Sequence, residues 1–340
     1  MGTVFGAAVT PTVLVTAAPD VDRLARPGRH ALSHVLTTLA DGSPLVLPVV
    51  IVAGRQPRPR VLAVAGVHGD EMEGVVALQA IAAETDPACL RGTLVIVPIA
   101  NAPAFRAARR RSPLDDLDLN RTFPGDPAGS PSERLAYHLL HDYALGADFV
   151  LSMHSWGSRG LVIPYVEFPA GDGDIAGRSL RAARALGLEW CRVSRWHPGL
   201  LVSCAVRSGV PAVETEIGGL AAQQDATHQQ CRTVVDRLLH HLGLLAGDPP
   251  PAPAARVVRH REVAAPVGGV LWRCRRLGDP VTPGDVVAVV RDLHGSPLAE
   301  VTSPLESVVA AYRFCSSVNP GDPVATLFEQ TAETVTGPER

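Results

Sequence analysis

Two patterns of apolar and polar positions alternate along the chain as far as Leu245. Some segments repeat apolar residues at helix-like spacing, and continuous apolar runs of buried-strand type lie between them. The runs are Leu45–Val52, Val61–Gly66, Thr93–Ile99, Asp148–Met153 and Pro211–Thr215, and the helix-like segments are Glu71–Glu84, Ser132–Tyr143, Ile175–Leu186 and Ala226–Leu242. Strands that alternate with helices predict an α/β domain in which helices flank a sheet.

The pattern changes after a Pro/Ala-rich stretch at 248–256, which predicts a stiff, extended linker. Short β-type runs follow, separated by Gly-Asp and Pro-Gly turns: Gly269–Cys274, Val286–Val290, Ser307–Tyr312 and Pro323–Phe328. The turns Leu277–Val281 and Asn319–Val324 are similar, which predicts a small all-β sandwich of two related halves. We therefore expect an α/β domain at 1–247 with an N-terminal β segment at about 30–55, the linker, a β domain at 257–330 and a flexible tail at 331–340.

Composition narrows the class of protein. The chain is 46% hydrophobic and 19% charged with a net charge of −3, which favours a well-buried globular protein and gives no basic surface for nucleic acid or anionic membranes. No apolar run reaches the ~18 residues of a membrane span, and the N-terminus has no basic leader segment. The six cysteines are scattered without a C-x-x-C pair, as expected of free thiols in a reducing compartment. These features predict a cytoplasmic protein.

The basic residues are all arginine, since the chain contains no lysine. Schiff-base chemistry and lysine-attached cofactors are therefore excluded. The trailing β segment resembles the hammerhead fold of biotinyl and lipoyl carriers, but it has no lysine to carry a group. We expect it to cover an active-site mouth or to contact another subunit.

Polar residues follow the predicted strands at one edge of the sheet. His68 and Glu71 come after Val61–Gly66, His154 directly after Asp148–Met153, and Glu214 and Glu216 at the end of the last strand. The carboxyl ends of strands in open α/β sheets are where ligands bind. Two histidines and a glutamate form a ligand set of catalytic zinc that leaves a position open. We therefore predict one zinc per chain, held by His68, Glu71 and His154.

Asp70 has two interpretations of equal weight. It could orient the ring of His68 by a hydrogen bond, or it could cap the helix that follows.

The motifs together resemble the succinylglutamate desuccinylase/aspartoacylase family, a branch of the zinc carboxypeptidase superfamily. They are Gly66-Val67-His68-Gly69-Asp70-Glu71, Asp118-Leu119-Asn120-Arg121 with Phe123-Pro124-Gly125, His154 after a strand, and Thr215-Glu216-Ile217-Gly218. The resemblance covers about residues 30 to 330 and implies a mixed sheet flanked by helices. Arg110–Asp115 with Leu119–Gly125 is similar to the branch that includes N-acetyl-diaminobutyrate deacetylases.

The resemblance implies a role for each matched position. Glu216 corresponds to the carboxylate that handles the proton of water, Arg110 to the arginine that polarises the carbonyl, and Asn120 with Arg121 to the substrate-carboxylate clamp. Glu214 competes with Glu216, because alternation places both on one face of the strand. Arg109 and Arg111 compete with Arg110 for its role. Members of the family usually have small residues after the third metal ligand, whereas this chain has Trp156 two positions after His154. The identity of the acyl group therefore stays open.

The predicted function is zinc-dependent hydrolysis of a linear amide, which removes acetyl or another small acyl group from the nitrogen of an amino acid or diamino acid. The molecule that the protein binds is then its substrate, a small-molecule N-acyl amino acid. The oligomeric state stays open. One alternative is a metallocarboxypeptidase that cleaves a C-terminal residue from a small peptide. A second is a zinc-containing binding protein without catalysis.

Overall fold

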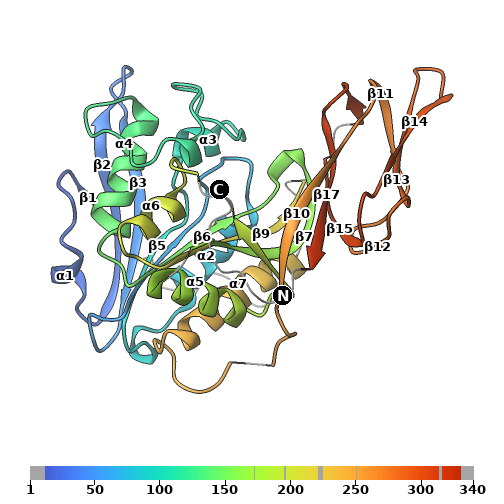
Figure 1. Cartoon of the computed structure of the whole chain (residues 1–340). Helices are drawn as coiled ribbons and strands as arrows, with labels where there is room; N and C mark the ends of the chain where they lie inside the picture. The colour runs from blue at the N-terminus through green and yellow to red at the C-terminus, as the bar shows by residue number, and fades with distance from the viewer. Residues whose placement is uncertain are drawn as a thin grey trace, which may run out of the picture.

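The computed structural model describes residues 12–171, 173–194, 197–220, 225–249, 251–313 and 316–330, so the predicted tail at 331–340 lies outside the described residues. A 13-stranded mixed sheet runs through the molecule in the order β1-β2-β3-β5-β4-β6-β9-β7-β8-β10-β17-β15-β12 (Figure 1). Its strands are β1 (Thr12–Val15), β2 (Gly28–Thr38), β3 (Pro44–Ala53), β4 (Arg60–Val64), β5 (Thr93–Val97), β6 (Phe149–His154), β7 (Gly160–Pro169), β8 (Trp190–Ser194), β9 (Ala212–Gly219), β10 (Arg256–Ala264), β12 (Pro280–Val281), β15 (Ser307–Arg313) and β17 (Pro323–Gln330).

Four neighbouring strands at the centre of this sheet are parallel, as the alternating pattern predicts. β4 pairs with β5 and with β6, and β6 pairs with β9, each in parallel register. Every residue of β4, β5 and β6 is buried. Parallel strands covered on both faces have near-continuous apolar sequences, which is why these runs are recognisable. Their carboxyl ends meet at one edge of the sheet.

Helices cover both faces of the central strands (Figure 1). One apolar core contains residues of α2, α5 and α7, and the other contains residues of α4, η3 and α6. The longer helices agree with the predicted ones within two residues, except that the predicted helix Ser132–Tyr143 ends in the wider π-helical turn η3. The helices are α1 (Val21–Leu24), α2 (Glu73–Glu84), α3 (Ala102–Arg106), α4 (Pro131–His138), α5 (Asp174–Ala185), α6 (Leu201–Arg207) and α7 (Asp225–His241), with η1 (Pro87–Cys89), η2 (Leu119–Arg121), η3 (Leu139–Ala144) and η4 (Gly157–Arg159).

The strands that follow the linker continue the main sheet. β10 pairs in parallel with β8, and β15 pairs antiparallel with β7. A second sheet, in the order β14-β13-β11-β16, packs against this extension around a shared apolar core. Its strands are β11 (Gly269–Arg273), β13 (Val286–Arg291), β14 (Pro297–Thr302) and β16 (Ser317–Val318). The trailing strands are thus hydrogen-bonded to the central sheet rather than connected by the linker alone.

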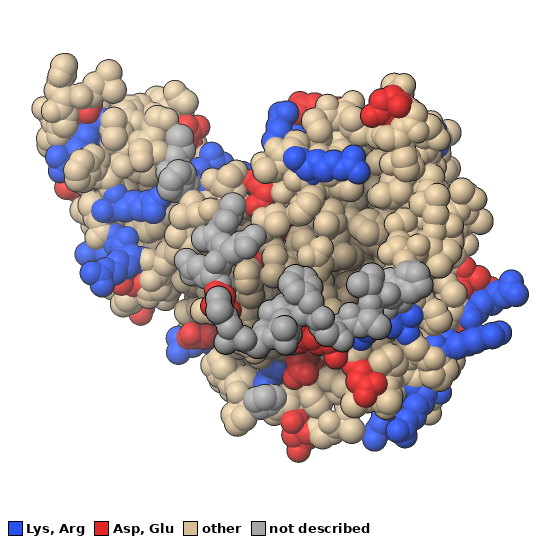
Figure 2. Space-filling model, turned by 180° about the vertical axis from the view of Figure 1, so that it is seen from behind, with Lys and Arg blue, Asp and Glu red and all other residues tan. Residues whose placement is uncertain are grey.

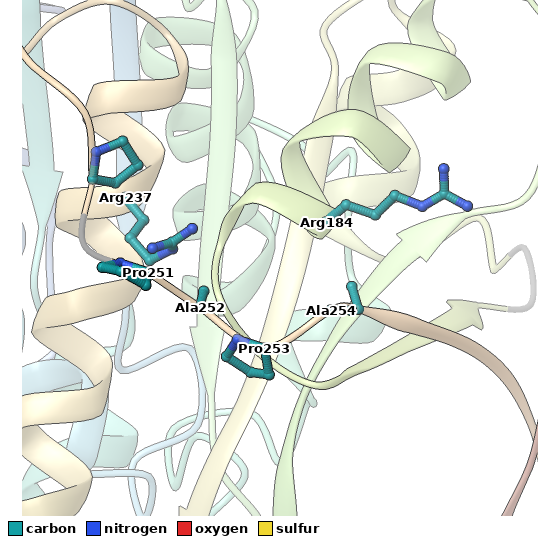
Figure 3. Close-up of a pocket in the computed structure, with 8 residues that line it drawn as sticks. Arg184, Arg237, Pro251, Ala252, Pro253 and Ala254 are labelled. Atoms are coloured by element: carbon teal, nitrogen blue, oxygen red, sulfur yellow. The ribbon is translucent and has the colours of Figure 1, made fainter.

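The linker runs over the helical side of the α/β part. Pro251–Ala254 pass Arg184 and Arg237 and enclose with them a surface hollow (Figure 3). The Arg237 Nε donates to the carbonyl oxygen of Ala185 at 2.8 Å. The proline-rich segment is therefore packed along α5 and α7, and this hollow shares no lining residue with the candidate active site.

Among the described residues, no helix has the length and apolar character needed to cross a membrane. On the face seen from behind, acidic residues and arginines are interspersed rather than gathered by sign (Figure 2).

Candidate active site

The turn after β4 carries His68 to the carboxyl edge of the sheet. Gly66 has a φ of +62°, a conformation that favours glycine. A Cβ on Gly69 would lie 2.0 Å from the backbone of Ala104, so no larger residue fits there. The Gly69 amide donates to the carbonyl oxygen of Arg109 at 3.0 Å. The turn is therefore fixed between α3 and the arginine-rich loop.

His68, Glu71 and His154 converge at this edge, as predicted. Nδ1 of His68 lies 2.7 Å from Oε1 of Glu71, and Nδ1 of His154 lies 2.9 Å from Oε2 of the same carboxylate. The two Nδ1 atoms are 3.3 Å apart, and all three side chains are buried. Two imidazole nitrogens and a carboxylate oxygen directed at one point suit a borderline divalent cation such as zinc. The residues therefore fit a metal site.

The other nitrogen of each histidine is held by a second residue. Nε2 of His68 contacts Oδ1 of Asp118 at 3.0 Å. Nε2 of His154 contacts Oγ of Ser152 at 2.9 Å and lies 3.6 Å from Oε2 of Glu214. Partners of this kind fix the tautomer and the ring orientation of a metal-binding histidine, so that Nδ1 faces the ion.

Both interpretations of Asp70 are wrong. Oδ2 of Asp70 accepts from the backbone amide and the hydroxyl of Ser158, at 3.0 and 2.7 Å, and Asp118 orients His68 instead. Helix α2 begins with Met72 as its N-cap and has no side-chain cap. The residue anchors the loop that follows β6, a long-range contact that no local pattern indicates.

The buried carboxylates at this centre favour positive charge on the side chains around them. Burial raises the pKa of Glu71, but the adjacent His68 and His154 lower it well below its usual value. Burial lowers the pKa of His154, yet Glu214 and Glu71 raise it to about 10. The carboxylates thus hold a proton on a buried imidazole, and a divalent cation can supply that charge in its place.

The two competing glutamates of β9 both face the pocket, but their surroundings differ. Oε2 of Glu214 accepts from Nδ2 of Asn120 at 3.3 Å. Oε2 of Glu216 is buried without a hydrogen-bond partner among the described residues. Burial and the negative charge of Glu71 raise the pKa of Glu216 well above its usual value. Of the two carboxyl groups, Glu216 is therefore the one with a buried oxygen that no described residue engages.

Of the three consecutive arginines, Arg110 extends into the site. Its Nε donates to Oδ2 of Asp118 at 3.0 Å, and its Nη1 lies 3.4 Å from Oε1 of Glu71. Arg111 lies at the surface, 3.6 Å from Asp116, and Arg109 is exposed. Arg110 is thus the arginine whose guanidinium lies beside His68 and Glu71.

The adjacent Asn120 and Arg121 lie in different surroundings. Asn120 is buried: its Oδ1 accepts from the amide of Leu201 at 3.2 Å, and its Nδ2 donates to Glu214. Arg121 is exposed on the pocket wall, and its Nη1 donates to the carbonyl oxygen of Asn120 at 2.7 Å. Arg121 therefore has further donors that face the cavity, whereas the amide of Asn120 is engaged by the protein.

The site opens into a cavity of about 870 Å³ whose wall carries both arginines and carboxyl groups. Arg110, Arg121 and Arg159 lie on its wall together with the carboxylates Glu167, Glu214 and Glu216. One oxygen of each of these three carboxylates lies within 4.8 Å of the others. The cavity can therefore bind a small molecule that carries both negative and positive charge.

Several lining residues were missed by the sequence motifs. Glu167 pairs with Arg192, which lies 5.1 Å from the centre of the Tyr165 ring. They lie on β7 and β8, strands without a predicted pattern. From the segment after the linker, four further residues reach the wall: His260, Glu262, Arg313 and Ser316. The extension of the sheet thus forms part of the pocket.

Trp156 lines the cavity and packs against the apolar cluster that includes Val162 and Phe328. It therefore forms an apolar part of the wall, close to His154 in the sequence.

Comparisons with known proteins agree with this arrangement. Residues 57–242 match the succinylglutamate desuccinylase/aspartoacylase catalytic domain. The N-alpha-acetyl-L-2,4-diaminobutyric acid deacetylase of Halomonas elongata is 35% identical over 295 residues, which are 84% of this chain and 86% of the relative.

Solved structures show the same fold. A succinylglutamate desuccinylase/aspartoacylase from Rhodobacter sphaeroides has a TM-score of 0.83 at 28% identity, over 91% of this chain and 97% of that one. The product-bound ectoine utilization protein EutE (DoeB) of Ruegeria pomeroyi has a TM-score of 0.82 at 27% identity, over 89% and 96%. The agreement includes the trailing strands as well as the matched catalytic segment, and the chain therefore belongs to the succinylglutamate desuccinylase/aspartoacylase family.

Proposed function

We propose that the protein is a zinc-dependent hydrolase that removes a small acyl group from the nitrogen of an amino acid or diamino acid. The observation that carries this proposal is the convergence of His68, Glu71 and His154 beside the unpartnered carboxyl group of Glu216. Amide hydrolysis needs a nucleophile, a base and an acid, and these groups can supply all three at one place.

A zinc ion held by the three ligands would lower the pKa of water to ~7 and act as a Lewis acid. Glu216 accepts the proton of the attacking water and then gives it to the nitrogen that leaves. Arg110 places its guanidinium beside the carbonyl oxygen and stabilises the negative charge that develops there. Arg121 binds the carboxylate of the substrate through its rigid fork of donors.

The carboxylates on the cavity wall support a diamino acid as the substrate class. A diamino acid acylated on one nitrogen keeps a second amine, which is positively charged at neutral pH. Besides Glu216, the cavity wall carries the carboxylates of Glu167 and Glu214, whose negative charge is opposite to that of such an amine. The relative from Halomonas elongata is named for a substrate of this kind. We infer that the acyl group is small, since Trp156 fills part of the wall.

The test is a screen of N-acyl amino acids and N-acyl diamino acids, with zinc content measured on the same sample. We expect hydrolysis of N-acetyl diamino acids and no release of C-terminal residues from dipeptides. Cleavage of dipeptides alone would favour the carboxypeptidase alternative. A protein with full zinc content and no turnover of any compound would favour the binding protein.

A further inference from the structure

A second cluster of two histidines and a carboxylate lies on the other side of the sheet from α2. One ligand atom from each of His34, His138 and Asp142 lies within 4.8 Å of the others. His34 comes from β2, His138 ends α4, and Asp142 lies in the π-helical turn η3. We propose that this cluster is a second, non-catalytic site for a borderline divalent transition-metal ion such as zinc.

The geometry of the rings is similar to that of the first centre. The ring centres of His34 and His138 are 5.3 Å apart, and those of His68 and His154 are 5.1 Å apart. Nδ1 of His138 lies 2.7 Å from Oδ2 of Asp142. The carboxylate and both imidazoles thus meet at one point, in the residue combination that binds zinc through nitrogen and oxygen.

His34 is oriented for this role by Tyr143. The Tyr143 hydroxyl lies 3.0 Å from Nδ1 of His34, and Nε2 of His34 has no hydrogen-bond partner among the described residues. When Nδ1–H donates to the hydroxyl oxygen, Nε2 carries the lone pair that a metal needs. His34 is also only 1% exposed, so its ring is held in a buried position close to His138 and Asp142.

The local structure separates this cluster from an ordinary helical ion pair. The contact between His138 and Asp142 is an ordinary i,i+4 contact along a helix. Such a contact does not explain why a buried histidine from a strand, His34, lies next to both of them. Asp142 and Tyr143 both lie in η3, and π-helical turns occur frequently at functional sites. The side chains of His138 and Asp142 are 20% and 14% exposed, which leaves the cluster open to an ion from solution. A bound ion would tie the edge of the sheet to η3.

The experiment uses the whole chain after its metal has been removed by a chelator. Zinc is added, and the bound ions are counted by native mass spectrometry in wild type, His138→Ala, Asp142→Asn and His154→Ala. We expect about two zinc ions per chain in wild type and about one in each variant. His141→Ala is the matched control, because His141 is an exposed neighbour on the same helical segment and lies outside the cluster. It should keep both ions.

Activity separates the two sites further. His138→Ala and Asp142→Asn should keep the hydrolysis rate within about twofold, because neither residue lines the catalytic cavity. Far-UV circular dichroism of each metal-free variant checks that the chain is folded, and the isosteric Asp142→Asn is the second test if His138→Ala unfolds. The proposal is overturned if wild type binds only one ion, or if both variants of the cluster retain two.

Discussion

The two histidine–carboxylate clusters of this protein have almost the same ligand types but very different surroundings. At the first, His68, Glu71 and His154 lie at the ends of buried parallel strands and face a cavity with Arg110, Arg121 and Glu216 on its wall. At the second, His34 lies on a strand near the sheet edge and meets a helical turn packed on the apolar core. Both sets of side chains could hold an ion, but catalysis also needs a base, a charge stabiliser and space for a substrate.

The largest expected effect tests which cluster is catalytic. His154→Ala should lower kcat/KM by at least about 10³-fold, because several kcal/mol of charge stabilisation depend on the metal. The measurement is steady-state hydrolysis of an N-acetyl diamino acid together with zinc content. If His138→Ala causes the same loss while it remains folded, the assignment of the two clusters is reversed.

The first cluster could be predicted from the sequence because its signals are local. His68 and Glu71 lie within one turn, and His154 directly follows an apolar strand, so strand order and parallel pairing bring them together. The central strands were recognisable for the same reason, since burial on both faces leaves a continuous apolar run. Glu216 was predicted through its motif, and its Oε2, which has no hydrogen-bond partner among the described residues, now distinguishes it from Glu214.

The second cluster and much of the pocket wall depend on contacts between distant segments. His34 lies on β2, in a segment whose pattern does not indicate a metal, and it meets His138 only after the sheet is formed. Glu167 and Arg192 lie on β7 and β8, and His260 reaches the cavity because β10 pairs with β8. Register between distant strands depends on packing, so local sequence does not specify such neighbours.

The next effect concerns the base of the first cluster. Glu216→Gln should retain zinc and lower turnover by ~10²- to 10⁴-fold, the size of general acid/base catalysis. Glu214→Gln is the matched control, since Glu214 faces the same cavity but is hydrogen-bonded to Asn120. Zinc content and single-turnover rates should be measured on both. A greater loss for Glu214→Gln than for Glu216→Gln would exchange their roles.

A smaller effect is expected at Arg121 on the cavity wall. Arg121→Lys should lose at least one charge-assisted hydrogen bond to the substrate carboxylate, about 1.5–3 kcal/mol, or on the order of 10- to 100-fold in kcat/KM. Zinc content should stay the same, because Arg121 is not a ligand. The amide analogue of the substrate should be a poor substrate of wild type and should be little affected by the substitution. Equal rates of wild type on the acid and the amide would contradict the clamp.

The smallest expected effect is on stability and reports on the second cluster alone. Without metal, Asp142→Asn loses only a partly exposed i,i+4 pair with His138, worth about 0.3–0.5 kcal/mol, so Tm should fall by about 1–2 °C.

An ion present at a concentration of 100 times its Kd stabilises the folded chain by about 2.7 kcal/mol. In the background of His154→Ala, where the first centre is disrupted, zinc should therefore still raise Tm by about 5–10 °C. Adding Asp142→Asn to that background should remove most of this increase, whereas adding His141→Ala should leave it. If zinc still raises Tm after Asp142→Asn, the ion binds elsewhere. The two clusters would then resemble each other in geometry, but only the first would bind a metal.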